Sequence, residues 1–393
     1  MNRDETAGFE MVAKTLTGLE ELLAAELVSI GAQDVTVLKR AVGFRGDTTL
    51  LYRANVECRL ATRILVPITS FRAGDRDELY RGVREVDWSE YLDREATFAV
   101  DVVVHNSRFK NSHYVALRTK DAIVDTLRAK TGSRPSVDLN NPSLRLNLYL
   151  AGTEASLALD SSGDPLHKRA YRREAGAAPL NEVLAAGIVA LTGWNGAAPL
   201  VDPMCGSGTI VIEAAMKARR IVPGLTRKRY GFMRWKDYDA ARYERIIEAA
   251  RTRVLSDLEA PIVGIDRDAS VVRAAQANAR RAGVADDVEL RCMSLEGLRP
   301  PPGPGVVVTN PPYGERLKPA HLRELYTSLG DALKKRYNDY KAYVFTANLE
   351  AAKAVGLRTS ERTVLFNGPL EGRLLTYELY SGSRKPGRTR PES

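Results

Sequence analysis

The stretch "NPPY", residues 310–313, follows the apolar run "GVVVT" and could hold the amino group of a planar substrate. Proline cannot donate a backbone hydrogen bond or continue a central strand, so the predicted strand ends there. Asn310 then offers a side-chain carbonyl oxygen and Pro311 a backbone carbonyl oxygen. These acceptors could bind both protons of an exocyclic amino group and free its nitrogen lone pair. Tyr313 could stack on a flipped base, or it could simply pack in a proline-rich turn. The catalytic candidates are Asn310, Pro311, Pro312 and Tyr313.

A second candidate site lies upstream, in "VDPMCGSGTIVIEAA". This pattern predicts a strand ending at Asp202, a loop with Gly206 and Gly208, and a helix from about Thr209. The glycines allow a tight turn, and the helix start offers free backbone N–H groups to a ligand. The phosphate-loop pattern is absent, and Val211 stands where a dinucleotide fingerprint needs glycine or alanine. A tight turn without any ligand is the alternative.

An acidic residue ends the next predicted strand, in "VGIDRD". Asp266 could accept hydrogen bonds from both hydroxyls of a ribose, although an aspartate after a strand is often only a helix cap. Ligands of open parallel sheets bind outside the carboxyl ends of the strands. Asp202, the glycines and Asp266 together predict a nucleoside site, to which the next parallel strand would deliver the NPPY stretch.

Strand and helix patterns alternate from about residue 180 onward, which predicts a doubly wound parallel sheet. The stretch "TVLFNGPLEGRLLTYELY" predicts an antiparallel pair at one edge of that sheet. Two smaller α/β domains are predicted before it, the second ending in the hairpin "LRLNLYLAGTEASLALD". The predicted limits are 1–65 and 66–165 for the two small domains, 166–180 for a basic linker, 181–382 for the large domain and 383–393 for a disordered basic tail.

The composition is that of a globular protein with a basic surface. The chain has 393 residues, a formal net charge of +9 and a sequence pI near 9.4. This charge suits a polyanion such as nucleic acid, or it describes a moderately basic enzyme. The N-terminus lacks the apolar core of a signal peptide, and no apolar stretch is long enough to cross a bilayer. Three scattered cysteines and four histidines show no disulfide or metal-ligand spacing. We therefore expect a reduced, cytoplasmic protein without a metal.

The motifs "DPMCGSGT", "GIDRD" and "NPPYGERL", in this order, resemble class I S-adenosylmethionine-dependent methyltransferases that act on amino groups of nucleic-acid bases. Beyond them, "SSGDPLHKRAYRREAGAAPLNEVLAAGIVALTGW" is similar to the linker and first helix of bacterial 23S ribosomal RNA guanine-N2 methyltransferases with a THUMP domain. "PGLTRKRYGFMRW" is similar to their insertion after the first-motif helix. "GLEELLAAEL", "TFAVDVVV" and "KDAIVD" resemble their N-terminal segments. The resemblance covers nearly the whole chain apart from the tail.

This resemblance implies a Rossmann-like methyltransferase domain with a mostly parallel seven-stranded sheet, preceded by ferredoxin-like and THUMP α+β domains. It implies that Asn310 to Tyr313 bind the amino group of the target guanine. Ser294 stands where such enzymes commonly carry an acidic residue near the adenine. Because some members carry a second methyltransferase and this chain ends at Ser393, we expect the form with a single activity. The implied S-adenosylmethionine ligands are Asp202, Pro203, Cys205, Gly206, Ser207, Gly208, Thr209, Asp266, Arg267, Ser294 and Asn310.

Basic residues interleaved with aromatic ones suit phosphate contacts and base stacking, although any one of them could be an ordinary solvated side chain. The predicted RNA-binding residues are Arg108, Lys110, Lys168, Arg169, Tyr171, Arg172, Arg173, Arg227, Lys228 and Arg229.

The leading hypothesis is methylation of a guanine N2 amino group in 23S ribosomal RNA. A tRNA guanine-N2 methyltransferase is the nearest alternative, because THUMP domains also serve tRNA enzymes. A DNA adenine methyltransferase would share NPPY without needing such a domain. A non-catalytic RNA-binding protein with a decayed fold is a further alternative, against which the intact motifs argue. The oligomeric state stays open.

Overall fold

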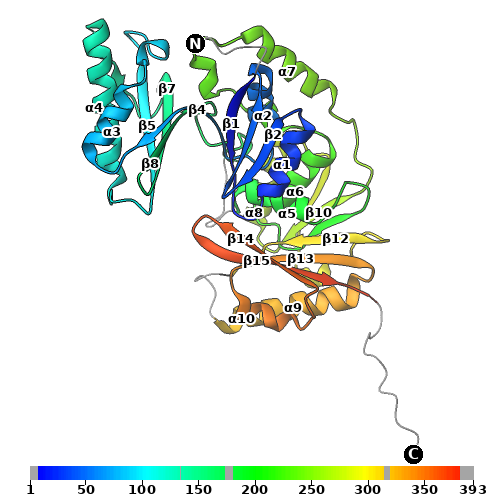
Figure 1. Ribbon diagram of the computed structural model, residues 1–393. Coiled ribbons are helices and arrows are strands. Elements are labelled where there is room, and N and C mark those ends of the chain that lie inside the picture. The colour runs from blue at the N-terminus through cyan, green and yellow to red at the C-terminus, as the bar shows by residue number, and fades with distance from the viewer. Residues whose placement is uncertain (1–7, 133, 173–179, 314–318, 381–393) are drawn as a thin grey trace, which may run out of the picture. The chain divides into compact units, whose positions relative to one another are not determined.

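The computed structural model in Figure 1 describes residues 8–132, 134–172, 180–313 and 319–380. The chain divides into two compact units. Unit 1 comprises Met1–Ala170 and Arg220–Val254, and unit 2 comprises Tyr171–Arg219 and Leu255–Ser393. In the part of the chain that the structure describes, every helix is too short or too polar to span a membrane.

Unit 1 is built on an eight-stranded sheet with the order β2-β3-β1-β4-β8-β7-β5-β6. Strand β4 joins its two halves, because its first residues pair with β1 and the rest pair with β8. The predicted hairpin is confirmed as β7–β8, and β2 and β3 form another antiparallel pair. The strands are β1 (Phe9–Lys14), β2 (Gln33–Leu38), β3 (Ala41–Gly46), β4 (Arg63–Arg72), β5 (Thr97–His105), β6 (Ser136–Val137), β7 (Leu144–Ala151) and β8 (Glu154–Asp160). The helices are α1 (Glu20–Ser29), α2 (Thr48–Glu57), α3 (Arg76–Arg84), α4 (Ser112–Thr131) and α7 (Ala240–Thr252).

The segment Arg220–Val254 completes the interior of unit 1, although it interrupts unit 2 in the sequence. Phe232 is fully buried and stacks between Tyr52 and Tyr230, with ring centroids 4.3 Å and 5.1 Å away. The Phe232 N–H donates to the carbonyl of Ser161 at 2.9 Å. The predicted limits 181–382 include this segment, because its apolar pattern does not show which core it enters.

Unit 2 contains a seven-stranded sheet with the order β11-β10-β9-β12-β13-β15-β14. The first five strands are parallel, and β15 runs antiparallel to both β13 and β14. The predicted class of fold, with its antiparallel edge, is therefore confirmed. The strands are β9 (Leu200–Asp202), β10 (Ile262–Asp266), β11 (Val288–Cys292), β12 (Gly305–Thr309), β13 (Tyr340–Thr346), β14 (Glu361–Asn367) and β15 (Leu370–Glu378).

Helices cover both faces of this sheet. Figure 1 shows α5 (Glu182–Leu191), α6 (Thr209–Ala218) and α8 (Ala269–Ala282) on one face, and α9 (Pro319–Arg336) with the short α10 (Leu349–Ala352) on the other. Strands buried on both faces are continuous apolar runs, as "GVVVT" in β12 illustrates. The strand order reverses between β9 and β12, and the carboxyl ends of strands at such a switch point form the usual ligand site.

Candidate active site

Three neighbouring parallel strands bring the predicted residues to one edge of the sheet. Asp202 ends β9, Asp266 ends β10, and Asn310 directly follows β12. The hydroxyl of Thr309, the last residue of β12, donates to Asp202 Oδ1 at 2.8 Å. This buried bond connects the carboxylate of one motif to the residue preceding Asn310 in the other.

Asp202 is buried, with 1% of its surface exposed. Burial raises the pKa of its carboxyl to about 7, and the negative charge of Asp266 adds to this effect. Hydrogen bonds from Thr309 and from the Met204 N–H, at 3.1 Å, partly offset the rise because they favour the charged form. This carboxyl therefore titrates in the neutral range.

The loop after β9 is held against the end of β10. The Cys205 N–H donates to the carbonyl of Ile265 at 2.8 Å. The Gly206 N–H donates to Asp266 Oδ2 at 3.1 Å, and the Asp268 N–H donates to Asp266 Oδ1 at 3.0 Å. A carboxylate has about four acceptor positions, so Asp266 keeps capacity for further donors.

Two glycines in this loop adopt left-handed backbone conformations, with φ of +54° at Gly206 and +83° at Gly208. A Cβ at Gly208 would lie 3.1 Å from the Cβ of Ala275 on α8, whereas a Cβ at Gly206 would have no atom within 4 Å. Gly208 thus permits close packing of the loop on α8, and Gly206 faces open space. Sequence reasoning missed Gly264 in β10. Glycine is needed there because a Cβ would lie 3.2 Å from the Cβ of Cys205. A glycine inside a strand is the signal that could have found it.

The side-chain oxygen of Asn310 is a buried acceptor that points to a ligand. This atom, Oδ1, is buried and has no hydrogen-bond partner among the residues that the structure describes. A buried acceptor without a partner costs about 1–3 kcal/mol, so such an atom calls for an explanation. A donor from a bound molecule would satisfy it.

Tyr313 is fixed by two contacts within unit 2. Its ring meets that of Phe345 edge to face, with centroids 6.1 Å apart, and its hydroxyl accepts a hydrogen bond from Asn367 Nδ2 at 3.3 Å. Sequence reasoning missed Asn367, the last residue of β14, because no local motif marks it.

The remaining candidates near this edge differ in exposure. The buried ones are Pro203, Cys205, Ser207, Thr209 and Pro311, and the exposed ones are Arg267, Ser294 and Pro312. Burial raises the pKa of the Cys205 thiol well above its usual value. Across the described ranges, no three His, Cys, Asp or Glu residues are grouped so that they could hold a metal ion.

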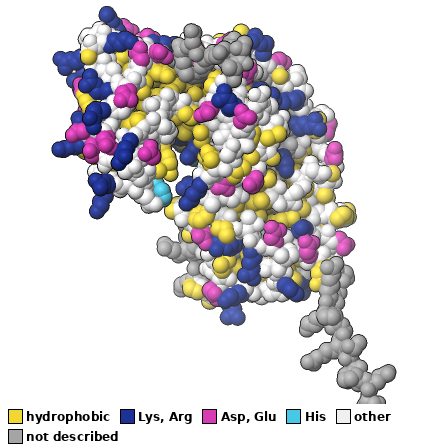
Figure 2. Space-filling view, viewed as in Figure 1, with side chains coloured by type: hydrophobic (Ala, Val, Ile, Leu, Met, Phe, Trp, Pro, Cys, Tyr) yellow, Lys and Arg dark blue, Asp and Glu magenta, His cyan; other side chains and the backbone are white. Residues whose placement is uncertain are grey.

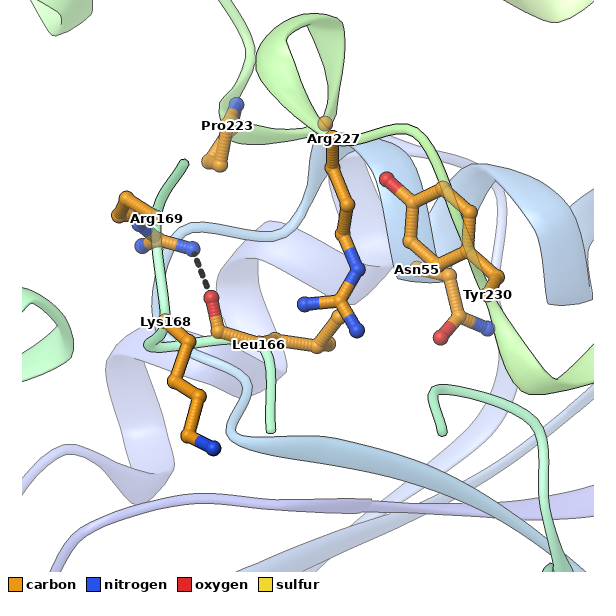
Figure 3. Close-up of a pocket in the computed structure, with 8 residues that line it drawn as sticks. Asn55, Leu166, Lys168, Arg169, Pro223, Arg227 and Tyr230 are labelled. Carbon is orange, nitrogen blue, oxygen red and sulfur yellow. Dashed lines mark hydrogen bonds between the residues drawn. The ribbon is translucent and has the colours of Figure 1, made fainter. Parts of the chain in front are cut away.

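Two predicted RNA-binding arginines of unit 1 are structural. Arg169 is 5% exposed and donates to the carbonyls of Leu166 and Arg59 at 2.8 Å and 2.6 Å, the first of which is drawn in Figure 3. Arg227 lies over the Tyr230 ring, and burial lowers the pKa of its guanidinium. It donates to the carbonyls of Ser162, Asp164, Pro165 and Arg229.

Two linker residues of unit 2 are also engaged. Tyr171 is 1% exposed, so it is not placed to stack on a base, and its hydroxyl donates to Glu213 Oε1 at 2.9 Å. Arg172 forms an ion pair with Glu182 at 3.0 Å. Arg173 lies outside the described residues. The predicted basic residues that are exposed are Arg108, Lys110, Lys168, Lys228 and Arg229. Figure 2 shows basic side chains spread over the visible surface among acidic ones.

Three family models match the chain. The model described as "RMKL-like, methyltransferase domain" matches residues 169–376, "THUMP domain" matches 73–160, and "RlmL ferredoxin-like domain" matches 10–65.

Similar proteins match along nearly the whole chain. "Ribosomal RNA large subunit methyltransferase K/L" of Syntrophotalea carbinolica is 43% identical over 385 residues, which cover 95% of this chain and 54% of that protein. The chain thus spans about half the length of that relative. A Synechocystis sp. protein, named provisionally as an RNA methyltransferase, is 37% identical, and the match covers 94% of this chain and 96% of that protein. A solved structure of SMU.472 complexed with SAH, provisionally named a methyltransferase, is 31% identical with a TM-score of 0.86 and covers 96% of this chain and 99% of its own.

The two loop glycines provide a matched pair of variants. We expect Gly206→Ala to lower the free energy of unfolding by about 1–2 kcal/mol, the penalty of a left-handed alanine. Gly208→Ala adds contacts of 3.1 Å with Ala275 and 3.3 Å with Ile212, so we expect a loss of about 2–4 kcal/mol. Urea unfolding of both variants measures the difference. Equal losses would contradict the packing role of Gly208.

The raised pKa of Asp202 predicts a pH-dependent stability. Its folded pKa of about 7 lies above the unfolded value of about 3.9, so only the folded protein holds the proton between these values. The contribution of this bound proton to the free energy of unfolding is fully present below about pH 4 and is lost as the pH rises through about 7. Relative to Asp202→Asn, which stays neutral, the unmodified protein should lose roughly 2 kcal/mol between pH 5 and pH 8. Urea unfolding at several pH values measures this, and parallel curves would contradict it.

Proposed function

We propose that this chain, which belongs to the RMKL-like methyltransferase family, transfers a methyl group from S-adenosylmethionine to the N2 amino group of a guanine in 23S ribosomal RNA. Family membership confirms the resemblance that the sequence motifs indicate. The buried Oδ1 of Asn310, which has no partner among the described residues, is the observation that carries the proposed chemistry.

The residues at the ends of β9 and β10 fit S-adenosylmethionine. The first turn of α6 presents backbone N–H groups, and Gly206 faces open space beside it. The loop from Asp202 to Thr209 would hold the methionine part, and the remaining acceptor capacity of Asp266 would take the ribose hydroxyls. When bound, the cofactor would supply an activated methyl group, so the protein needs no strong base to generate a nucleophile.

The residues after β12 fit an amino group. Asn310 Oδ1 accepts one N2 proton of the guanine, and the Pro311 carbonyl accepts the other. Holding both protons keeps the nitrogen lone pair from delocalising into the ring and orients it for attack. Tyr313, fixed by Phe345 and Asn367, offers its ring as a stacking surface for the extruded base. The surplus proton leaves to solvent after transfer.

RNA is the substrate class that the two N-terminal domains favour. The THUMP model matches residues 73–160, and the name of the Syntrophotalea relative specifies large-subunit ribosomal RNA. Exposed basic side chains of unit 1 would contact phosphates, chiefly Lys228, Arg229, Lys168, Arg108 and Lys110. Arg169, Arg227 and Tyr171 are not part of this surface, because they are buried or bonded to the chain itself.

The direct test is methyl transfer from labelled S-adenosylmethionine to protein-free 23S rRNA, 16S rRNA and bulk tRNA, with nucleoside mass analysis. We expect N2-methylguanosine in 23S rRNA alone. The same nucleoside in tRNA alone would keep the chemistry and replace the substrate. Binding of RNA without cofactor binding or transfer would support the non-catalytic alternative.

Asn310→Ala tests the role of its side-chain carbonyl in the same assay. We expect turnover to fall about a hundredfold or more, by analogy with the loss of one fixed polar group at other reacting centres. Calorimetry with S-adenosylhomocysteine should show that the variant still binds the cofactor, because the loop from Asp202 to Thr209 and Asp266 are unchanged. Near-normal turnover in this variant would rule out the amino-group role.

Charge reversal of Lys228 and Arg229 tests the RNA surface. We expect the double variant Lys228→Glu/Arg229→Glu to bind RNA roughly tenfold more weakly at about 0.1 M salt and to show a salt slope lower by about 1–2. Lys334→Glu/Lys335→Glu on α9 changes the net charge equally and serves as the control. Filter binding over a salt series measures both quantities. Equal effects of the two double variants would show that only net charge matters.

A further inference from the structure

A buried chain of polar groups lies behind the loop that follows β9. Asn278 on α8 is 0% exposed, and its Nδ2 donates to the carbonyl of Ser207 at 3.1 Å. Its helical neighbours toward the core, Ala275, Ala279 and Ala282, are small and buried. Burying an amide among such residues is unfavourable unless its hydrogen bonds are made. The hydrogen bonds that the Asn278 amide makes therefore explain why a polar side chain is buried at this position.

Arg281 sets the orientation of the Asn278 amide. Its Nη2 donates to Asn278 Oδ1 at 2.7 Å, and its Nε donates to the carbonyl of Tyr171 at 2.8 Å. A guanidinium is a donor only, so the atom facing it must be the amide oxygen. The amide nitrogen then faces Ser207. The direction of the bond to the loop thus follows from the chemistry of Arg281.

The chain of bonds returns to the helix that the loop opens. Tyr171, which contributes its carbonyl to Arg281, donates its hydroxyl to Glu213 on α6 at 2.9 Å. Glu213 and Tyr171 are each 1% exposed. Helix α6 begins at Thr209, two residues after Ser207. The loop, α8, Tyr171 and α6 are therefore joined into one closed set of contacts within unit 2.

The loop needs an anchor of this kind. Ser207 stands between two glycines with positive φ, and glycine has more accessible backbone conformations than any other residue. Asp266 holds Gly206 on one side of Ser207. A bond to the Ser207 carbonyl fixes the peptide that leads into Gly208 and the first turn of α6.

We propose that Asn278 is a positioning residue for the cofactor loop, and that Arg281 acts through it. This inference rests on the proposed function, because it takes S-adenosylmethionine to be the ligand of the loop. Asn278 holds the Ser207 carbonyl so that the N–H groups at the start of α6 keep the direction that the cofactor requires.

Asn278→Asp tests the donor alone. Aspartate has nearly the same shape and keeps an acceptor for Arg281, but it places an oxygen against the Ser207 carbonyl. We expect the Kd for S-adenosylhomocysteine, measured by calorimetry on the full chain, to rise about tenfold, consistent with one lost buried hydrogen bond. The kcat at saturating S-adenosylmethionine should change less than twofold, and the KM for the cofactor should rise with the Kd.

Arg281→Met supplies a second variant, with Arg280→Met on the exposed side of α8 as its matched control. We expect Arg281→Met to raise the Kd severalfold and Arg280→Met to leave it unchanged. Combining Arg281→Met with Asn278→Ala, which removes the amide through which Arg281 acts and adds no charge, should weaken binding no further than Asn278→Ala alone. Additive effects would overturn that dependence.

The outcomes separate this inference from the function on which it rests. If the unmodified protein fails to bind S-adenosylhomocysteine, the proposed function fails and the positioning role fails with it. If the unmodified protein binds and Asn278→Asp binds equally well, only the positioning role is overturned. A fall in melting temperature with unchanged Kd and KM would show that Asn278 serves the fold alone.

Discussion

The site of unit 2 depends on one buried carboxyl group, that of Asp202. Asp202 loses nearly all its solvation, and the protein compensates with two donors, the Thr309 hydroxyl and the Met204 N–H. The first donor comes from the end of β12 and the second from the loop after β9. A charged or polar group in the interior must find its partners in fixed places. Asp202 therefore holds the start of the loop after β9 and Thr309, the residue before Asn310, in a defined relation.

The loop after β9 contains flexible glycines, and hydrogen bonds to neighbouring elements restrict its conformation. Its glycines let the backbone turn and let α8 approach, but they add conformations that must be suppressed. The suppression comes from outside the loop: Asp266 holds Gly206, the Ile265 carbonyl holds Cys205, and Asn278 holds Ser207. Each anchor lies on β10 or α8. The conformation of this loop is therefore set by β10 and α8 as well as by its own sequence.

Sequence reasoning located the residues whose positions follow from strand order. Asp202, Asp266 and Asn310 each lie at or just after the end of an apolar run, and parallel strands bring such ends to one edge. It did not locate Asn278, Arg281 or Asn367, because their partners lie far away in the chain and no local pattern marks them.

The basic residues show why composition is a weak guide to a binding surface. Arg169, Arg227 and Lys228 are alike in charge and in the company of aromatic residues. The structure buries the first, surrounds the second with carbonyls, and exposes the third. Whether a basic side chain faces solvent depends on which carbonyls the fold leaves without donors nearby, and that is a tertiary property.

Unit 2 is built from two separate stretches of the chain, so the end of the first stretch and the start of the second must be held together. The chain leaves this unit after Arg219, directly beyond α6, and re-enters at Leu255. The Leu255 N–H donates to the Arg219 carbonyl at 3.0 Å, which pairs the two ends of the excursion. Arg219 Nη1 also donates to Asp287 Oδ1 at 2.6 Å, before β11. These bonds close the base of the excursion inside unit 2, so the end of α6 is held even though the next segment belongs to unit 1. Helix α6, which directly follows the loop after β9, is thereby held at both ends.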